Sequence, residues 1–439
     1  MTRLAIRGDL LDLVADPGLT AVASPAVRFD ADHWLLVDGG RIVGRQAAAP
    51  GEGWQQVDHR GRLILPGFID AHVHMPQLEV IASHGTDLLD WLNQHTFPAE
   101  LRYADPAVSH DGAARFADAL LAHGTTSAVV FPTVHAVSAE AMFEAAAARG
   151  MRCITGKVLM DRHAPAGLLD DVATAEADCV DLIERWHGRA RQAFALTVRF
   201  APCSTPAQLA MAGRLLASRP DLYLQTHVAE NRDEVAWVAQ LFPQARSYLD
   251  VYANHGLLGP RSVLAHGIWL DDADRALLAR TGAAIAHCPT SNLFLGSGLM
   301  DWRALADSGA GVVMASDVGG GTGLSMQRTL AAAYQVQALQ GLKLSAWALL
   351  HAATRGAAAA LQLADEIGSL APGRLADLTV WDWAVGPVAR WRDARAATAG
   401  SLHDRVFAWL TLGDERGLAQ TFVAGQSRYV RDPRALETA

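Results

Sequence analysis

Two histidines lie two residues apart in the segment LPGFIDAHVHMPQ, at positions 65–77. The segment has the apolar character of a β-strand, and Pro66 and Gly67 mark its start. Because alternate residues of a strand point to the same side, His72 and His74 can bind one cation together. An isolated pair of this kind is equally compatible with two ordinary buried or surface histidines, since the chain has 17 histidines.

Further apolar segments end in side chains that suit metal binding or proton transfer. The polar residues at their ends are Arg199, His227, Glu230, His266 and Asp317. Three imidazoles and a carboxylate, completed by water, favour Zn²⁺ or Fe²⁺ over Ca²⁺ or Mg²⁺. The sequence contains neither HExxH nor the H-x-E…P-C-x-x-C pattern of zinc deaminases. If the strand ends converge, these histidines and acids predict a metal centre that belongs to neither of these two motif types.

Glu230 and Asp317 are the candidate proton carriers. Glu230 follows His227 in an HxxE pair before a predicted helix, so it can carry a proton beside a metal-bound water or simply complement the helix dipole. Asp317 follows the apolar run GVVMAS, where an acid is costly unless it binds something. The glycines after Asp317 lack the GxxxxGK[ST] pattern of a phosphate loop, and we expect them to let the backbone approach a planar ligand.

A second pair of residues, His287 and Cys288 in AIAHCPTSN, suggests a Cys–His nucleophile. Neighbouring residues of a strand point to opposite faces, so the two side chains would pair poorly. We therefore interpret both residues as structural, and we expect PTSN to form a loop over the site.

The middle of the chain alternates apolar strand candidates with helical stretches rich in Ala and Leu. The eight strand candidates begin at Leu63, Thr126, Arg152, Ala195, Leu222, Val263, Ala283 and Gly311. Helical stretches such as AEAMFEAAAARG end at glycine, as helices often do. This alternation predicts an α/β fold, a (β/α)8 TIM barrel whose active site lies at the carboxyl ends of the strands. A doubly wound sheet is the alternative, weakened by the lack of a GxGxxG fingerprint.

Both ends of the chain contain short strands and turns. WLLVDGGRIVGR at 34–45 and QTFVAGQSRYV at 420–430 each predict a hairpin around a glycine-containing turn. We expect the two ends to combine into a small β-sandwich domain. Its expected parts are residues 1–65 and 376–439, and the expected barrel covers residues 66–375.

Composition narrows the class of protein. The 439 residues carry a formal net charge of −9 without blocks of like charge, which argues against a nucleic-acid surface. Four separated cysteines without CxxC fit a reducing compartment. Acidic residues at positions 9 and 12 do not fit a signal peptide, and charged or polar residues interrupt the most apolar stretch, Ala346–Ala364. We expect a cytoplasmic protein with neither nucleic-acid nor membrane partners.

The segments PGFIDAHVH, HVAE, LAHG, HCPTSN and SDVGGGT resemble the amidohydrolase superfamily, metal-dependent hydrolases built on a (β/α)8 barrel. More specific segments are HVHMPQ, LLDWLNQHTFPAE, GKVLMDRHAP, TVRFAP, ERWH and TLGDERG. They resemble the branch of this superfamily that converts guanine to xanthine and ammonia. The resemblance runs from about Gly61 to Arg428. It also implies the small domain built from both chain ends.

The resemblance implies a role for each matching residue. The implied metal ligands are His72, His74, His227 and Asp317, holding one zinc per subunit, with iron as the alternative. The implied catalytic residues are Glu230, which transfers protons, Asp317, and His266, which contacts the metal-bound water or the substrate. The implied contacts to guanine are His74, Gln77, Arg199, Phe200, His227, Glu230 and Asp317. A homodimer is expected by analogy.

Minor departures from the family pattern occur at His163, Gly267 and Ser316, and none of them removes a ligand. Two alternatives stay open from the sequence. One is a related hydrolase acting on another amino- or chloro-substituted ring, such as a cytosine, a triazine or an adenosine-like compound. The other is a scaffold without catalytic activity on the same fold.

Overall fold

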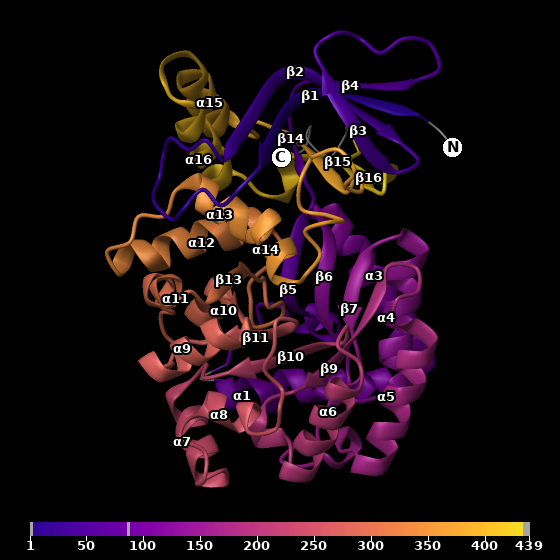
Figure 1. Cartoon of the computed structure of the whole chain (residues 1–439), viewed down its shortest axis with the longest axis vertical. Helices are drawn as coiled ribbons and strands as arrows, with labels where there is room; N and C mark the ends of the chain where they lie inside the picture. Colours follow the sequence, from indigo (N-terminus) through magenta and orange to yellow (C-terminus); the bar gives the residue numbers. More distant parts are fainter. Residues whose placement is uncertain (1–2, 86–87, 433–439) are drawn as a thin grey trace. The chain divides into compact units, whose positions relative to one another are not determined.

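The structure is a computed structural model, and it describes residues 3–85 and 88–432 (Figure 1). It divides into two compact units. The barrel unit comprises Asp70–Ala117 and Ala128–Leu324. The terminal unit comprises Met1–Ile69, Asp118–Ser127 and Ser325–Ala439. The domain boundaries expected above stay a prediction.

The predicted (β/α)8 barrel is confirmed. Its strands, in spatial order, are β5 (Phe68–His74), β6 (Thr125–Phe131), β7 (Arg152–Thr155), β9 (Gln192–Val198), β10 (Tyr223–Val228), β11 (Ser262–His266), β12 (Ala284–His287) and β13 (Gly311–Met314). The register from β7 to β13 is parallel. The first strand meets the chain after the last one, because the His74 N–H donates to the Val318 carbonyl at 2.8 Å and the Asp317 N–H to the His72 carbonyl at 2.9 Å.

All eight strand candidates correspond to these strands, with one interruption. The segment RCITGKVLM forms β7 and then a separate short strand, β8 (Val158–Leu159), which pairs with β9. The break falls at Gly156, where a side-chain Cβ would lie 2.1 Å from the Ala195 carbonyl oxygen. Only a glycine lets the two backbones approach this closely.

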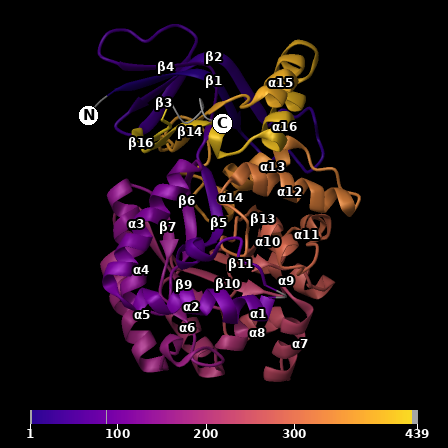
Figure 2. The ribbon, with the colours of Figure 1, turned by 180° about the vertical axis from the view of Figure 1, so that it is seen from behind.

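Helices surround the barrel strands, as Figures 1 and 2 show. They are α3 (Pro106–Ala122), α4 (Ala136–Arg149), α5 (Val172–Trp186), α6 (Pro206–Ser218), α7 (Arg232–Leu241), α8 (Tyr248–Ala253), α9 (Asp272–Thr281), α10 (Pro289–Phe294) and α11 (Trp302–Ser308). Side chains at Asp171, Thr205 and Asn231 cap helix N-termini. The predicted end of α4 is confirmed, because Gly150 adopts a left-handed conformation there.

Short helical turns join β5 to α3. They are η1 (Met75–Val80), α1 (Leu88–Trp91), η2 (Leu92–Thr96), α2 (Phe97–Leu101) and η3 (Arg102–Ala104). Two further short turns in the barrel unit are η4 (Ala166–Leu168) and η5 (Ala201–Cys203). Buried residues of α1, η2 and α2 pack with Phe131, Met160 and Phe200 in one apolar cluster. The LLDWLNQHTFPAE motif therefore forms a wall beside the strand ends.

The terminal unit contains one mixed sheet from both chain ends. Its strand order is β16 (Gln426–Val430), β15 (Leu418–Val423), β14 (Leu378–Asp382), β4 (Gln55–Pro66), β1 (Leu4–Leu13), β2 (Val27–Asp38) and β3 (Arg41–Gln46). Both predicted hairpins are present, as the antiparallel pairs β2–β3 and β15–β16. The expected β-sandwich takes the form of this single sheet, in which only β1 and β4 pair in parallel.

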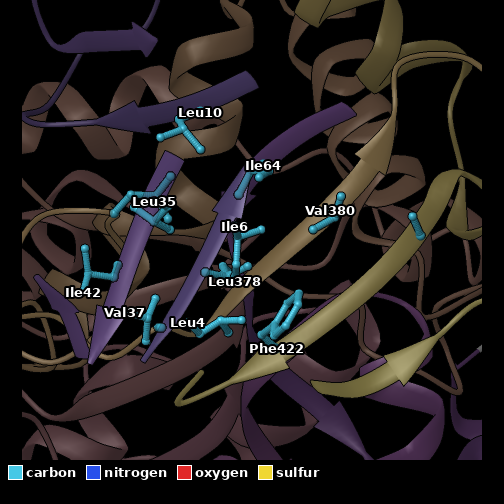
Figure 3. Packing of buried hydrophobic residues seen from close by; sticks show 13 residues of the cluster. Leu4, Ile6, Leu10, Leu35, Val37, Ile42, Ile64, Leu378, Val380 and Phe422 are labelled. Atoms are coloured by element: carbon cyan, nitrogen blue, oxygen red, sulfur yellow. The ribbon is translucent and has the colours of Figure 1, made fainter. Parts of the chain in front are cut away.

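An apolar core holds the two chain ends together in this sheet. Ile6 of β1 lies with Leu378 and Val380 of β14 and with Phe422 of β15 (Figure 3). The unit also contains α12 (Met326–Leu339), α13 (Ala346–Ala353), α14 (Arg355–Ala360), α15 (Pro387–Ala399), α16 (Leu402–Leu412) and η6 (Glu415–Gly417). None of the helices in the described ranges is long and apolar enough to cross a membrane.

We predict that Ile6→Ala destabilises the terminal unit. Ile6 is fully buried, so the shortened side chain loses apolar contacts and leaves a cavity that costs about 2–5 kcal/mol. Chemical unfolding followed by circular dichroism measures the change. Val43→Ala on β3 is the matched control, because Val43 is 51% exposed and its truncation should cost under about 0.5 kcal/mol. Equal effects of the two substitutions would contradict this description of the core.

Candidate active site

Four side chains from three places in the barrel point their ligand atoms at one another. His72 and His74 end β5, His227 lies near the end of β10, and Asp317 follows β13. The three Nε2 atoms are 3.1–3.2 Å apart. Oδ1 of Asp317 lies 3.2 Å from Nε2 of both His72 and His74. The four residues are therefore a candidate metal centre.

The spacing of these atoms fits a small tetrahedral cation. Bonds of about 2.0–2.1 Å from zinc to nitrogen or oxygen place neighbouring ligand atoms about 3.3 Å apart. All five distances given above lie within 0.2 Å of that value. The donor set of three imidazoles and one carboxylate also suits a borderline cation. The residues present thus fit a bound divalent transition metal.

The protonation states suit ligation. Burial lowers the pKa of His72, lowers that of His74 to about 3, and holds that of His227 well below its ordinary value. Burial raises the pKa of Asp317, but its contacts with His72 and His74 outweigh that effect, so the carboxyl stays ionised. Nδ1 of His227 lies 2.7 Å from the Arg199 carbonyl, which can only accept. The His227 proton therefore sits on Nδ1, and its Nε2 lone pair faces the centre.

Glu230 and His266 stand beside this centre. Nε2 of His266 lies 3.3 Å from Oε2 of Glu230 and 3.8 Å from Oδ2 of Asp317. Burial lowers the pKa of His266, but the two carboxylates outweigh it and raise the pKa above the ordinary value. Burial also raises the pKa of Glu230. Glu230 accepts a hydrogen bond from the Ser297 hydroxyl at 2.8 Å, and Nδ1 of His266 donates to Asn292 Oδ1 at 2.9 Å.

The backbone is strained where two of these side chains are held. His266 has φ of +73° and Asp317 has φ of +50°, in a region that residues with side chains rarely adopt. Such conformations persist only where the surrounding structure enforces them, and they are enriched at functional sites. The strain therefore marks the ends of β11 and β13 as places where side-chain direction matters.

A buried acid, Asp70, holds the residue that precedes Asp317 in the chain. Asp70 on β5 accepts from the Ser316 N–H at 3.0 Å and from the Ser316 hydroxyl at 2.5 Å. Burial raises the Asp70 pKa to about 7 in spite of these bonds. The pair ties the residue before Asp317 to the strand that carries His72. The departure at position 316 thus keeps a hydroxyl that makes a hydrogen bond.

A pocket opens onto the centre. Its lining residues are His74, Gln77, Leu88, Trp91, Leu92, Arg199, Phe200, His227, Glu230, Glu234, His266, Leu295, Asp317 and Gly320. Phe200 is buried and packs edge-on to Trp237 at a centroid distance of 6.3 Å. Gln77 and Arg199 are buried polar groups of this lining, and both lie beside Glu100. The cavity therefore combines an apolar wall with a few directed polar groups, as ligand sites do.

The structure brings together every residue predicted for the site. The exact functional roles of these residues stay predictions. His287 lies apart, against Trp302, while Cys288 is buried with its Sγ within 4.8 Å of ligand atoms of His266 and Asp317. PTSN begins helix α10 instead of forming a loop, because Pro289 starts the helix and Asn292 reaches His266 from it.

Several residues of the site were missed by the sequence reasoning. They are Asp70, Glu100, Glu234, Asn292 and Ser297, each within hydrogen-bond reach of a predicted site residue or its neighbour. Glu234 accepts from the Glu230 N–H at 3.0 Å and from the Tyr248 hydroxyl at 2.6 Å. The available signal was the spacing of Asn231 and Glu234, which is the sequence pattern of a capping box, and Glu234 completes that box at the start of α7.

Residues 63–427 match the model of the amidohydrolase family. The chain belongs to this family, as the barrel and the His/Asp centre at its strand ends indicate. It is 42% identical over 438 residues to the guanine deaminase of Escherichia coli (strain K12), across 98% of this chain and 99% of that protein.

Solved structures agree. A guanine deaminase from Bradyrhizobium japonicum matches with a TM-score of 0.93 and 32% identity, across 98% of this chain and 100% of that one. A guanine deaminase from C. acetobutylicum with guanine bound in its active site matches with a TM-score of 0.86 and 27% identity, over the same shares.

We predict that Ser316→Ala weakens metal binding by about 10–100-fold, the usual effect of losing a group that supports a ligand. The substitution leaves an oxygen of Asp70 without its hydroxyl partner and loosens the segment that carries Asp317. Ser316→Thr is the control, since it keeps the hydroxyl and should keep the affinity. Competition with a chromophoric chelator measures both. Parental affinity in the alanine variant would show that Asp317 is positioned without this bond.

Proposed function

We propose that the chain hydrolyses guanine to xanthine and ammonia. One observation carries the proposal: a single cavity presents both a His/Asp metal centre and the buried guanidinium of Arg199. The first suits attack of water on a ring carbon, and the second suits the acceptor edge of guanine. The relatives named guanine deaminase support the same substrate.

We assign one zinc ion per chain to His72, His74, His227 and Asp317, with iron as the alternative metal. When bound, such an ion lowers the pKa of a coordinated water from 15.7 toward about 7 and so supplies a nucleophile at neutral pH. The protein's part is to present neutral imidazoles in a dry cavity. The pKa directions of the three histidines support that part.

The proton transfers belong to the residues beside the centre. Glu230 is buried with a raised pKa, so its carboxyl can hold a proton and deliver it to N3 of guanine as C2 is attacked. Asp317 accepts one proton of the attacking water and passes it to the amine at C2, which leaves as ammonia, and Glu230 regains its proton from the hydroxyl on C2 as the carbonyl of xanthine forms. His266, whose pKa two neighbouring carboxylates raise, can donate a hydrogen bond to the oxygen that adds to C2.

Arg199 and Gln77 select the substrate. Guanine presents O6 and N7 as acceptors, whereas adenine presents a donor at position 6. A guanidinium only donates, so adenine would leave Arg199 unpaired in a buried site, at a high cost. Gln77 provides an amide donor and acceptor, and Phe200 provides an apolar face for the ring.

The metal and Arg199 are coupled through His74. Nη1 of Arg199 lies 3.2 Å from Nδ1 of His74, a contact that requires the His74 proton to sit on Nε2. Ligation by Nε2 requires that proton on Nδ1 instead. If Nε2 of His74 held a metal, Nδ1 would carry the proton and could not accept from Arg199, so this guanidinium nitrogen would be left for the substrate.

We also propose a homodimer in the cytoplasm. The four cysteines are free and buried, which supports a reducing compartment. The dimer rests on analogy with related enzymes alone. Light scattering coupled to size exclusion tests it, and a monomer mass at working concentration would refute it.

We predict release of ammonia from guanine, and not from cytosine, adenine or melamine, by the purified protein. His72→Ala and Asp317→Ala should each abolish turnover, because each removes a metal ligand. Xanthine formation is followed by absorbance, and metal content is measured in the same samples. Full activity of either variant without bound metal would overturn the metal assignment.

We predict that Arg199→Ala lowers kcat/KM for guanine by at least about a hundredfold, because the acceptor edge of the base loses its donor in a buried site. Metal content should change far less, since Arg199 supplies no ligand atom to the centre. Steady-state kinetics and elemental analysis report the two effects. Unchanged kinetics with guanine would mean that Arg199 does not contact O6.

A further inference from the structure

Glu100 is a buried acid that lies beside Gln77 and Arg199, the two residues proposed to select the substrate. It lies on the short helix α2 and is 1% exposed. Its Oε1 accepts a hydrogen bond from Nε2 of Gln77 at 3.2 Å and lies 3.6 Å from Nη2 of Arg199. Its Oε2 has no hydrogen-bond partner within the described residues. Burying a carboxylate with one oxygen unpartnered is costly, so its retention here calls for a reason.

Glu100 fixes which way the Gln77 amide faces. The Gly319 N–H donates to Oε1 of Gln77 at 3.2 Å, so that oxygen lies on the Gly319 side. The Glu100 carboxylate accepts from Nε2 on the opposite side. With both ends held, the amide cannot flip, and it retains one N–H and one lone pair for a ligand.

Glu100 also offsets the charge of Arg199. The Arg199 side chain is 5% exposed and lies beside His74, so its positive charge opposes a cation at the metal centre. A nearby carboxylate compensates that charge without occupying the guanidinium, because 3.6 Å is longer than a strong ionic hydrogen bond. Among the described residues, Nη1 contacts His74, and it is thus left for a substrate acceptor once that contact is lost.

We propose that Glu100 is a positioning residue that holds Gln77 and Arg199 ready for the 6-oxo edge of the purine, and so sets the preference for a 6-oxopurine. The inference rests on the proposed function and adds to it a residue that lines neither the cavity nor the metal centre. We expect a selective effect, because Glu100 contacts Gln77 and Arg199, which face the 6-oxo edge, and contacts none of the residues assigned to the attack of water on C2.

The test compares Glu100→Gln with the parent on two ligands. Glutamine keeps the shape and an acceptor for Gln77 but removes the charge. Guanine carries O6, whereas 2-aminopurine has the same amine at C2 and no O6. We expect kcat/KM for guanine to fall by about tenfold or more, chiefly through KM, since orientation of bound substrate is lost. For 2-aminopurine, kcat/KM should change less than about threefold. If 2-aminopurine is not turned over, its inhibition constant should stay within the same limit.

Two controls separate this role from a structural one. Glu79→Gln removes an exposed carboxylate from the same region, one that pairs with Arg102, and should leave both ligands unaffected. Metal content of Glu100→Gln should match the parent. In an Arg199→Ala background, Glu100→Gln should lower guanine kcat/KM by less than about twofold further, because residues acting as one unit are not additive.

Guanine kinetics unchanged by Glu100→Gln would overturn the inference, and so would equal losses for guanine and 2-aminopurine. Failure of the proposed function looks different, because the unaltered protein would then not turn over guanine at all.

Discussion

The barrel unit brings four buried ligand atoms to one point, and the residues around that point are arranged to keep them there. Three imidazole nitrogens and one carboxylate oxygen lie 3.1–3.2 Å apart with almost no access to water. Such groups are costly to bury without a partner. A metal held by these four residues would offset this cost, so metal binding and stability of the strand ends should be linked.

The surrounding structure keeps these atoms in place. Asp70 ties Ser316 to β5, the Arg199 carbonyl sets the tautomer of His227, and Asn292 orients His266. The left-handed backbone at His266 and Asp317 is maintained by this network. The acids beside the centre then differ in environment: burial raises the pKa of Glu230, while imidazole contacts hold that of Asp317 low. This separation is what assigns one acid to hold a proton and the other to stay ionised.

Much of the fold could be predicted from sequence, because its strands are short apolar runs and its helices have helical periodicity and glycine ends. The candidate site followed for the same reason: His72, His227 and Asp317 stand at strand ends, which a barrel brings to one rim. Glu100 could not be found this way. It lies on a short helix 23 residues after Gln77, and only tertiary packing shows that it contacts Gln77. The start of α10 at PTSN was also missed, because a turn-rich segment can begin a helix when a proline opens it.

The central claim is that metal held by the His/Asp centre makes the cavity catalytic toward guanine. The most direct measurement strips the purified protein with a chelator, returns zinc in steps, and follows bound metal and xanthine formation in the same sample. The account predicts no turnover in the stripped protein and a rate that rises in proportion to bound zinc up to one ion per chain. Xanthine formation at the full rate by metal-free protein would contradict it.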